Sequence, residues 1–411
     1  MQHRATTTEV LDTISLEKQT DIHVEEALTR KSKETSDEDE FDLEFTREDW
    51  RKIKRRIDRR LIVTCGFMYT ISVMDRNNVG AAAIAGLTTE LQLTVGYRYS
   101  VVVLAFFATY CVFQAPATIL CRKIGPRFFL AGTTFAFGVV MIGFGFPQTW
   151  TALLGLRLLL GVLEAGFFPA CVYLISTWYS RYDMHKRYSF FYLIGSLASG
   201  FAGILAYGLM QMNGIAGLSG WRWIFIIEGI FTCVVGIVGY FLLIDFPDRS
   251  LKKSWRFLSE RELKFVIRQL SKDRDDVEPE PWNFKRWASS GLDPKVWGFA
   301  MIFFGVVTNA TGIGFFLPII LRQSMGFSVA AAQCLVAPPF GFAGIMMLAT
   351  SWVGDKYRIR GPIVAFNATL CLIGLPIMGF ASTAGTRYFG VFLTTAGTHA
   401  NLPAMMVYQV G

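Results

Sequence analysis

The sequence predicts an all-α protein that crosses a membrane many times. Of its 411 residues, 52% are hydrophobic and only 18% are charged, and the mean hydropathy is +0.38. A soluble chain of this length carries more charge, because it needs a polar surface. The hydrophobic residues also gather in segments close to the ~20 residues with which a helix spans a bilayer. Ten such segments occur, whereas a large soluble protein could bury only about two or three helices of this kind.

The ten segments form a group of six and a group of four, separated by a charged stretch. We expect a six-helix bundle at 61–245, a cytoplasmic loop at 246–295, and an incomplete four-helix bundle at 296–411. The expected membrane helices are 61–85, 100–120, 127–146, 150–177, 188–210, 222–244, 296–320, 331–352, 363–381 and 388–410.

Basic residues beside the apolar segments predict which way the chain faces. The stretch Arg51–Arg60 holds seven basic residues and one acidic residue directly before the first segment. Loops after alternate segments are also basic, whereas the loops between them are almost bare of charge. Because basic residues collect on the cytoplasmic side, we expect the N-terminus and the 246–295 loop to be cytoplasmic. Residues 1–60 form the expected N-terminal tail, which begins polar and disordered and ends basic.

Several other classes of protein are disfavoured. The net charge of +8 comes from residues at membrane edges, so it does not indicate nucleic-acid binding. None of the seven cysteines forms a C-x-x-C pair, so neither disulfides nor a metal site is expected. No nucleophile–base pair or phosphate-binding glycine loop is present, so we expect neither a cofactor nor an enzyme.

The two groups of segments show an internal repeat. Subtracting 233 from the numbers of the last four segments moves them to 63–87, 98–119, 130–148 and 155–177, onto the first four. Parallel repeats of six helices describe the major facilitator architecture, which holds its substrate between the halves near the midplane. The second group has no counterparts of segments five and six, so we expect a C-terminally truncated chain.

Two loops at the same offset resemble a loop pattern of that superfamily, Gly-x-Leu-Ala-Asp-Arg-x-Gly-Arg-Arg. They read "TILCRKIGPR" (Thr118–Arg127) and "SWVGDKYRIR" (Ser351–Arg360). In the pattern, the aspartate clamps neighbouring helices on the cytoplasmic side. Asp355 fits the acidic position, whereas Arg122 stands there in the first half. The resemblance implies a structural or gating role for both residues.

The first segment carries charges where charges are costly, in "ISVMDRNNVGAAA" (Ile71–Ala83). Asp75 lies roughly 21 Å along a helix that begins at Leu61, and each charge costs about 3 kcal/mol there. Adjacent helical positions point about 100° apart, so Asp75 and Arg76 cannot share a face unless the helix unwinds. One interpretation is a structural ion network. The other is that Arg76 binds an anionic substrate, with Asn77 as an amide donor and Asp75 as a structural partner and second candidate for proton coupling.

The fourth segment carries a second charged pair, in "LRLLLGVLEAGFFPACVY" (Leu156–Tyr173). Arg157 and Glu164 are seven residues apart, so they share a helix face. Burial favours a neutral glutamate whereas a nearby arginine favours an ionised one, and a side chain balanced between them can carry a proton. Arg157 is then a substrate-binding residue and Glu164 a proton-coupling residue. The alternative is a static Arg157–Glu164 ion pair.

The sixth segment opens with "GWRWIFIIEGI" (Gly220–Ile230). Arg222 and Glu228 are six residues apart and therefore lie on different faces, so we expect each to find a partner on another helix. Both are assigned structural or gating roles. Trp221 and Trp223 suggest a membrane-interface position.

Four further residues of the second group are candidates. His399 is the only membrane histidine and could titrate near neutral pH, although a neutral, packed histidine is the alternative. Asn309, Phe315 and Phe316 are expected to line the substrate cavity. The run "GSLASGFAG" (Gly195–Gly203) indicates a packing face for a close neighbour.

Three motifs resemble the fungal anion:cation symporter family, whose members include permeases for allantoate, nicotinate, pantothenate and biotin. They are "MDRNNVGAAAIAGL" (Met74–Leu87), "LRLLLGVLEAGFFPACVYLISTWYSR" (Leu156–Arg181) and "GLSGWRWIFIIEG" (Gly217–Gly229). The resemblance implies a major facilitator fold and proton-driven uptake of a small organic anion at the plasma membrane. The family motif positions are occupied by Arg76, Arg157, Glu164, Arg222 and Glu228.

The sequence therefore predicts a monomeric secondary transporter that works by alternating access, with an arginine holding a carboxylate and a proton on Glu164. Two alternatives remain. One is a transporter-like nutrient sensor that signals through its tail and central loop. The other is a truncated product that does not transport.

Overall fold

The structure, a computed structural model, describes residues 45–179, 181–247, 258–273, 289, 291–357 and 361–410. The side chains at 47, 181–186, 189, 271–273, 355 and 406–410 also fall outside this description. So do the expected disordered tail at 1–44 and most of the 246–295 loop. The chain divides into two compact units, 1–56 and 57–411.

Every element of the described residues is helical. The first unit holds most of α2 (Arg47–Ile57), which begins with acidic residues and ends with basic ones, as the helix dipole favours. The short elements η1, η2 and η4 are π-helices, and η3 is a 3-10 helix. The second unit contains η1 (Asp58–Ile62), α3 (Val63–Ala82), η2 (Ala83–Leu87), α4 (Thr88–Glu90), α5 (Arg98–Ile124), α6 (Pro126–Gly143), α7 (Trp150–Glu164), α8 (Phe167–Trp178), α9 (Arg181–Met210), η3 (Ile215–Gly217), α10 (Gly220–Leu242), α12 (Glu260–Asp273), α14 (Pro294–Ile319), η4 (Ile320–Ser324), α15 (Val329–Cys334), α16 (Ala337–Tyr357), α17 (Gly361–Phe380) and α18 (Ala384–Val410).

Eight helical spans among the described residues are long and apolar enough to cross a membrane. They coincide with the second to the ninth expected segments. The first and tenth segments are helical too, as α3 and α18, but polar side chains such as Asp75 and His399 lower their hydropathy. The chain is therefore an all-α, multi-pass membrane protein, which confirms the predicted fold class.

The first helix passes through its charged residues without unwinding. A π-helix flanks α3 at each end, and both Asp75 and Arg76 lie inside the regular α-helical part. Gly86 in η2 has a φ of 117°, a conformation that side-chain-bearing residues rarely adopt. Because α3 is regular at this point, the two charged side chains point toward different neighbours.

The helix bounds repeat at the offset found in the sequence. Moved back by 233 residues, α14 falls on 61–86, the α15–α16 pair on 96–124, α17 on 128–147 and α18 on 151–177. These ranges match the first helix, α5, α6 and the α7–α8 pair. The proposed domain bounds at 245 and 296 stay a prediction.

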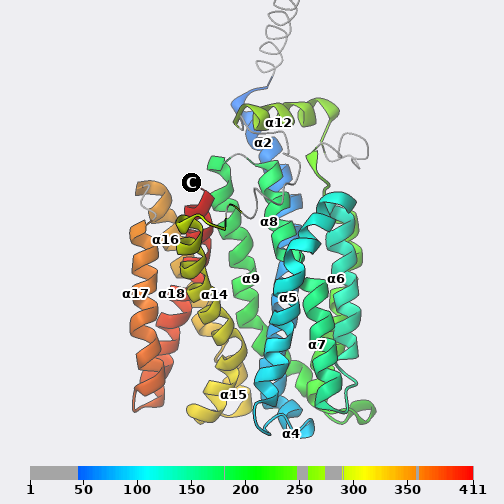
Figure 1. Cartoon of the computed structure of the whole chain (residues 1–411), viewed down its shortest axis with the longest axis vertical. Coiled ribbons are helices and arrows are strands. Elements are labelled where there is room, and N and C mark those ends of the chain that lie inside the picture. The colour runs from blue at the N-terminus through cyan, green and yellow to red at the C-terminus, as the bar shows by residue number, and fades with distance from the viewer. Residues whose placement is uncertain are drawn as a thin grey trace, which may run out of the picture. The chain divides into compact units, whose positions relative to one another are not determined.

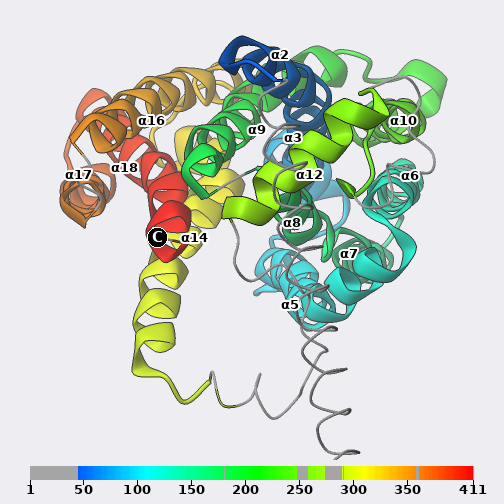
Figure 2. The same ribbon diagram turned by 90° about the horizontal axis from the view of Figure 1, so that it is seen from above.

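The two groups of helices meet mainly along two helices of the first group. Within the first group, α6 packs on α10, α5 on α7, and α3 on α9; within the second, α18 packs on α16 and α17. Across the groups, α3 contacts α14, and α9 contacts α15, α16 and α18. Figure 2 shows α14, α16, α17 and α18 on one side of α9, and α5, α6, α7 and α10 on the other.

The groups approach most closely near one end of the helices. Figure 1 shows α4 and α15 at this end, which we call the α4 end. A Cβ atom added to Gly80 of α3 would lie 2.6 Å from the carbonyl oxygen of Phe315 in α14. The side-chain amide of Gln333 in α15 donates to the carbonyl oxygen of Ala81 at 3.3 Å. Backbones therefore meet here with almost no side chain between them.

The predicted packing face on α9 is confirmed. A Cβ atom on Gly200 would lie 3.0 Å from the Cβ of Phe340 in α16, and one on Gly203 would collide with the carbonyl oxygen of Gln333. Small residues thus let α9 contact α15 and α16 closely.

Candidate functional site

An ion pair joins the first and fourth membrane helices. Nη2 of Arg76 lies 2.9 Å from Oε2 of Glu164, and Nε of Arg76 lies 3.3 Å from the same oxygen. Ser72, one turn earlier on α3, donates to this oxygen at 3.3 Å. Glu164 is fully buried, whereas 19% of the Arg76 side chain is exposed. Arg76 is therefore the accessible member of the pair.

Arg157 does not form the pair with Glu164 that was one interpretation of the sequence. Its side chain is fully buried, and none of its three guanidinium nitrogens has a hydrogen-bond partner among the described residues. The physical reason is spacing: seven residues separate the two side chains by ~10.5 Å along α7, while Arg76 reaches Glu164 from α3. The structure thus holds a buried cation without an anion bonded to it.

Aromatic rings lie beside both arginines. The guanidinium carbon of Arg76 lies 5.2 Å from the ring centre of Phe106 and 5.0 Å from that of Tyr110, both on α5. The guanidinium carbon of Arg157 lies 5.3 Å from the ring centre of Phe144. Cation–π contacts of this kind stabilise a guanidinium group away from water.

Asp75 points to the other side of α3, toward α10. It is buried, and the hydroxyl oxygen of Thr232 lies 3.0 Å from its Oδ2 and 2.8 Å from the carbonyl oxygen of Glu228. The side-chain amide of Asn78 donates to Oε2 of Glu228. One oxygen of each of Asp75, Asn78 and Glu228 has no partner among the described residues. We call Asp75, Asn78, Glu228 and Thr232 the α3–α10 cluster.

The predicted substrate residues of the second group make no direct bond to the arginines among the described residues, although the centre of the Phe315 ring lies 5.8 Å from that of Phe107 on α5. Asn309 of α14 donates to the Thr398 hydroxyl at 3.0 Å. Phe315 is buried at the α4 end, where its carbonyl oxygen accepts from the Tyr99 hydroxyl at 3.4 Å. Among the described residues, no hydrogen bond or ion pair joins Asn309 or Phe315 to either arginine. Their substrate roles stay predictions.

Asn77 and His399 lie where the two groups of helices meet. The amide of Asn77 donates to the Ser199 hydroxyl of α9 at 3.4 Å. His399 is buried between groups, with Nδ1 lying 3.5 Å from the Tyr192 hydroxyl and its ring centre 4.9 Å from that of Phe340. This is the packed environment that the sequence offered as the alternative to a titrating histidine.

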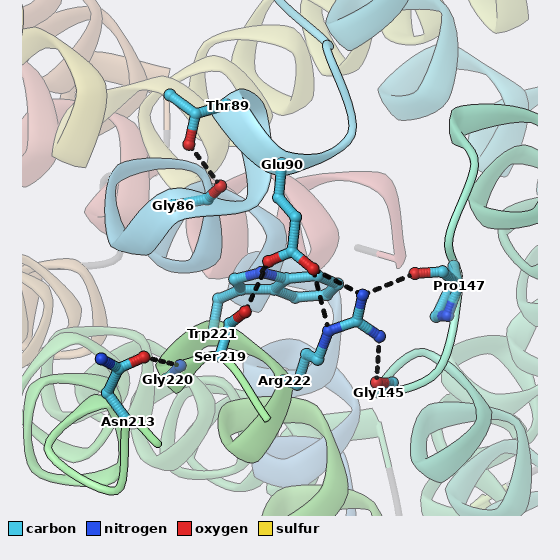
Figure 3. Close-up of polar contacts among 10 residues, drawn as sticks. All are labelled: Gly86, Thr89, Glu90, Gly145, Pro147, Asn213, Ser219, Gly220, Trp221 and Arg222. Carbon is cyan, nitrogen blue, oxygen red and sulfur yellow. Dashed lines mark hydrogen bonds and ion pairs between the residues drawn. The ribbon is translucent and has the colours of Figure 1, made fainter. Parts of the chain in front are cut away.

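Arg222 anchors a polar cluster at the α4 end (Figure 3). Its Nη2 lies 2.6 Å from Oε1 of Glu90, and its guanidinium also donates to the carbonyl oxygens of Gly145 and Pro147 at 2.8 and 3.0 Å. The Ser219 hydroxyl and the Trp221 indole each donate to Oε2 of Glu90 at 2.6 Å. We call Glu90, Ser219, Trp221 and Arg222 the Glu90 cluster.

The Glu90 cluster joins three connections between helices. Burial by itself would raise the pKa of Glu90, but hydrogen bonds from Ser219, Arg222 and Trp221 outweigh it and hold this pKa below its usual value.

The expectation that Arg222 and Glu228 find partners on other elements is confirmed. Trp221 is fully buried, so its predicted place at the membrane interface is wrong.

Two loop residues singled out by the superfamily pattern remain untested in their gating roles. Arg122 lies in the last turn of α5, with its guanidinium carbon 4.4 Å from the ring centre of Tyr173. Asp355 lies in α16, but its side chain is outside the described residues.

Some polar partners were not foreseen from the sequence. Asp58 accepts from the Tyr179 hydroxyl at 2.6 Å and from Nε of Arg187 at 2.7 Å, joining η1 to α9. In the sequence, Asp58 is only the one acid in a basic run. Ser72 and Thr232 are ordinary helix residues whose bonding depends on which helix lies opposite, so no sequence signal indicates them.

Within the first six membrane helices, away from the Glu90 cluster, lie Arg76, Arg157 and three buried carboxyl groups, those of Asp75, Glu164 and Glu228. Only one of those carboxylates, Glu164, is paired with a cation among the described residues. Such uncompensated charges are costly. Ionisable residues placed this way inside a membrane protein are therefore candidates for binding an ion or a charged ligand.

Comparison with known protein families identifies one match over most of the chain. The Major Facilitator Superfamily matches residues 65–410. The predicted superfamily is therefore confirmed.

Fungal transporters are similar in sequence. An uncharacterized transporter of Schizosaccharomyces pombe is 29% identical over 345 residues, which cover 84% of this chain and 68% of that protein. The high-affinity nicotinic acid transporter of Saccharomyces cerevisiae is 30% identical over 364 residues, which cover 88% of this chain and 66% of that protein.

A solved structure supports the fold. A bacterial homolog of the human lysosomal transporter Spinster, in an inward-facing and unoccupied conformation, superposes with a TM-score of 0.64 at 16% identity. The match covers 85% of this chain and 74% of the bacterial one.

Proposed function

The chain belongs to the major facilitator superfamily and is a multi-pass membrane transporter rather than an enzyme, and from this premise we propose that it imports a small organic anion together with protons. The observation that carries the proposal is Arg157. Its guanidinium is fully buried, and no described residue bonds to any of its three nitrogens, which is costly unless an anion binds it for part of the time.

A carboxylate suits these arginines. A guanidinium group presents several donors in one plane, which matches the two oxygens of a carboxylate. Arg76 is partly exposed and Arg157 is not, so we infer that the anion meets Arg76 first. The name of the yeast relative supports a compound such as nicotinate; allantoate and pantothenate are the other candidates.

Glu164 supplies a means of proton coupling. It already holds Arg76, so an incoming carboxylate competes with it for the same guanidinium. If the anion takes Arg76, Glu164 is left as a buried charge with only Ser72 as a donor, unless it binds a proton. Anion binding at Arg76 and proton binding at Glu164 therefore favour each other.

The direction of transport depends on orientation, which the distribution of basic residues supports. With the N-terminus in the cytoplasm, the α4 end faces outward at the plasma membrane, and the contacts of Gly80 and Gln333 hold the two groups of helices together on that side. The described conformation is then closed toward the outside. Opening there would admit the anion.

Uptake measurements test this function. The full chain is expressed in a host that lacks its own anion permeases, and uptake of labelled nicotinate, allantoate and pantothenate is followed across external pH. We expect uptake of one anion that increases in acid and is strongly reduced in Arg157→Met. Uptake of no anion, together with an altered transcriptional response to one of them, would instead favour the nutrient sensor.

A further inference from the structure

We propose that Asp75 and Glu228 of the α3–α10 cluster form a second proton-binding site, distinct from the Arg76–Glu164 pair. The inference rests on the proposed proton-coupled transport and adds to it the residues that hold another proton. Its ligand is a proton alone, with no metal or organic group.

The Thr232 hydroxyl gives the geometric reason. Its oxygen lies 2.8 Å from the Glu228 carbonyl oxygen and 3.0 Å from Oδ2 of Asp75, so both neighbours are acceptors. A hydroxyl has only one hydrogen to donate. Donation to the carbonyl oxygen four residues earlier is the usual arrangement for threonine in a helix. The contact with Asp75 is then satisfied only if the Asp75 carboxyl carries the hydrogen and Thr232 accepts it.

The unbonded oxygens give a second, independent reason. Asp75, Asn78 and Glu228 are 1%, 1% and 4% exposed, and each keeps one side-chain oxygen to which no described residue donates. These three buried oxygens can accept hydrogen bonds, but no hydrogen is available to them in the described part of the chain. A buried acceptor without a hydrogen bond lowers the stability of the folded protein. A proton on one carboxyl group adds a donor and removes a charge from the same small volume.

The neighbouring charges do not neutralise the pair. Asp75 interacts electrostatically with Glu228 and Cys233 on α10 and with Glu164 and Arg157 on α7. Only Arg157 in this set is a cation, and no ion pair joins it to Asp75 among the described residues. The other carboxylates repel a charge on Asp75. Two ionised carboxylates in such a site are unfavourable, which leaves one proton shared between them.

The position of the site links it to the anion. Asp75 and Arg76 are consecutive residues of one regular helix, with Asp75 facing α10 and Arg76 facing α7. Any rotation of α3 moves both side chains at once. A proton gained or lost at the α3–α10 cluster therefore changes the contacts that hold the anion-binding arginine in place.

The first experiment locates the proton by chemistry. A hydrophobic carbodiimide, which reacts with protonated carboxyl groups, is added to the purified full chain, and modified residues are identified by mass spectrometry. We expect labelling of Asp75 or Glu228 that decreases as the pH is raised. Labelling of Glu164 without either of them, or equal labelling at every pH, would overturn the site.

The second experiment separates coupling from structure. Proteoliposomes are assayed for exchange of labelled nicotinate, which needs no net proton movement, and for accumulation driven by a proton gradient. Glu228→Gln and Thr232→Val are expected to lose accumulation while exchange is retained, and Thr232→Ser, which keeps the hydroxyl, is expected to retain both. Proportional loss of both activities in Glu228→Gln, with an unchanged pH profile, would show a merely structural role. If the wild-type protein exchanges none of the proposed anions, the proposed function fails, and carbodiimide labelling still decides the proton site.

Discussion

Nη2 of Arg76 lies 2.9 Å from Oε2 of Glu164, although 88 positions of the chain separate the two residues. The pair joins α3 to α7. Among the described residues inside the bundle, Arg76 is the only cation bonded to a buried carboxylate. A transported carboxylate would have to replace Glu164 at this guanidinium. The predictions that follow test this exchange and the contacts that support it.

Glu164→Gln should uncouple transport from the proton gradient. The glutamine is neutral at every pH, so anion binding at Arg76 no longer requires a proton at position 164. We expect uptake that is no longer stimulated by acid, while exchange of labelled anion across proteoliposomes continues. Glu262→Gln, which alters an acid in α12, is the control and should leave acid stimulation intact. Acid-stimulated uptake that survives Glu164→Gln unchanged would rule out this assignment.

Arg157→Met should weaken anion binding without a large loss of stability. No hydrogen bond of Arg157 to a described residue is lost, a buried charge is removed, and methionine fills much of the volume of the arginine, so the melting temperature should change little or rise. Losing charge-assisted hydrogen bonds to a carboxylate costs about 1.5–3 kcal/mol, which corresponds to an increase in KM of roughly 10- to 100-fold. Uptake kinetics and thermal unfolding in detergent measure the two effects. A large fall in melting temperature with an unchanged KM would mean that Arg157 is structural.

Arg222→Ala should destabilise the α4 end. The change leaves Glu90 without its cation and the carbonyl oxygens of Gly145 and Pro147 without a donor. We expect a loss of about 2–3 kcal/mol of stability, the typical value of a hydrogen bond to a charged group. Arg98→Ala is the control. Among the described residues, its guanidinium makes one exposed hydrogen bond, to the Gln92 carbonyl oxygen at 3.3 Å, and lies 5.2 Å from the ring centre of Trp150. Thermal unfolding that does not distinguish the two variants would argue against the cluster.

Glu90 predicts a dependence of stability on acid. Its pKa is held below its usual value, so ionised Glu90 stabilises the folded state above pH ~4.5, and this contribution is lost as the pH falls through the lowered pKa. The melting temperatures of wild type and Glu90→Gln should therefore differ at neutral pH and converge in strong acid. A difference that grows on acidification would contradict the sign of the shift.

Gly80→Val should disturb closure at the α4 end. The added side chain would collide with the Phe315 carbonyl oxygen, because even a Cβ atom would lie 2.6 Å from it. We expect reduced uptake, and greater access of a membrane-impermeant reagent to a cysteine introduced at position 81. Gly312→Val is the matched control, since a Cβ atom there meets nothing within 4 Å. Equal effects of the two substitutions would mean that helix propensity, not the collision, is responsible.

The fold was more predictable than the site, for a physical reason. Apolar segment length and the repeat offset determine helix positions locally, and they predicted the eight apolar spans along with α3 and α18. The free-energy cost of burying a charge in a membrane also correctly marked four residues as unusual for such segments: Asp75, Arg76, Arg157 and Glu164. Their partners depend on which helices pack together and at what rotation, and that information is not local.

The wrong partner for Glu164 illustrates the limit. Periodicity along one helix suggested Arg157, because only residues of the same segment can be compared from sequence. The observed partner comes from α3, in a register set by the packing of α3 against its neighbours. The prediction for Trp221 was wrong for the same reason. Its residue type suggested a position at the lipid interface, but tertiary contacts bury it against Glu90.

The neighbouring positions of Asp75 and Arg76 make the first helix intolerant of insertions and deletions. One residue added between the π-helix η1 and Asp75 would rotate everything after it by about 100°. The acid would then turn away from Thr232 and the base away from Glu164, although the composition of the segment would hardly change. In this helix the direction of each charged side chain depends on the number of residues that precede it. An insertion or deletion should therefore reduce function more than most single substitutions do.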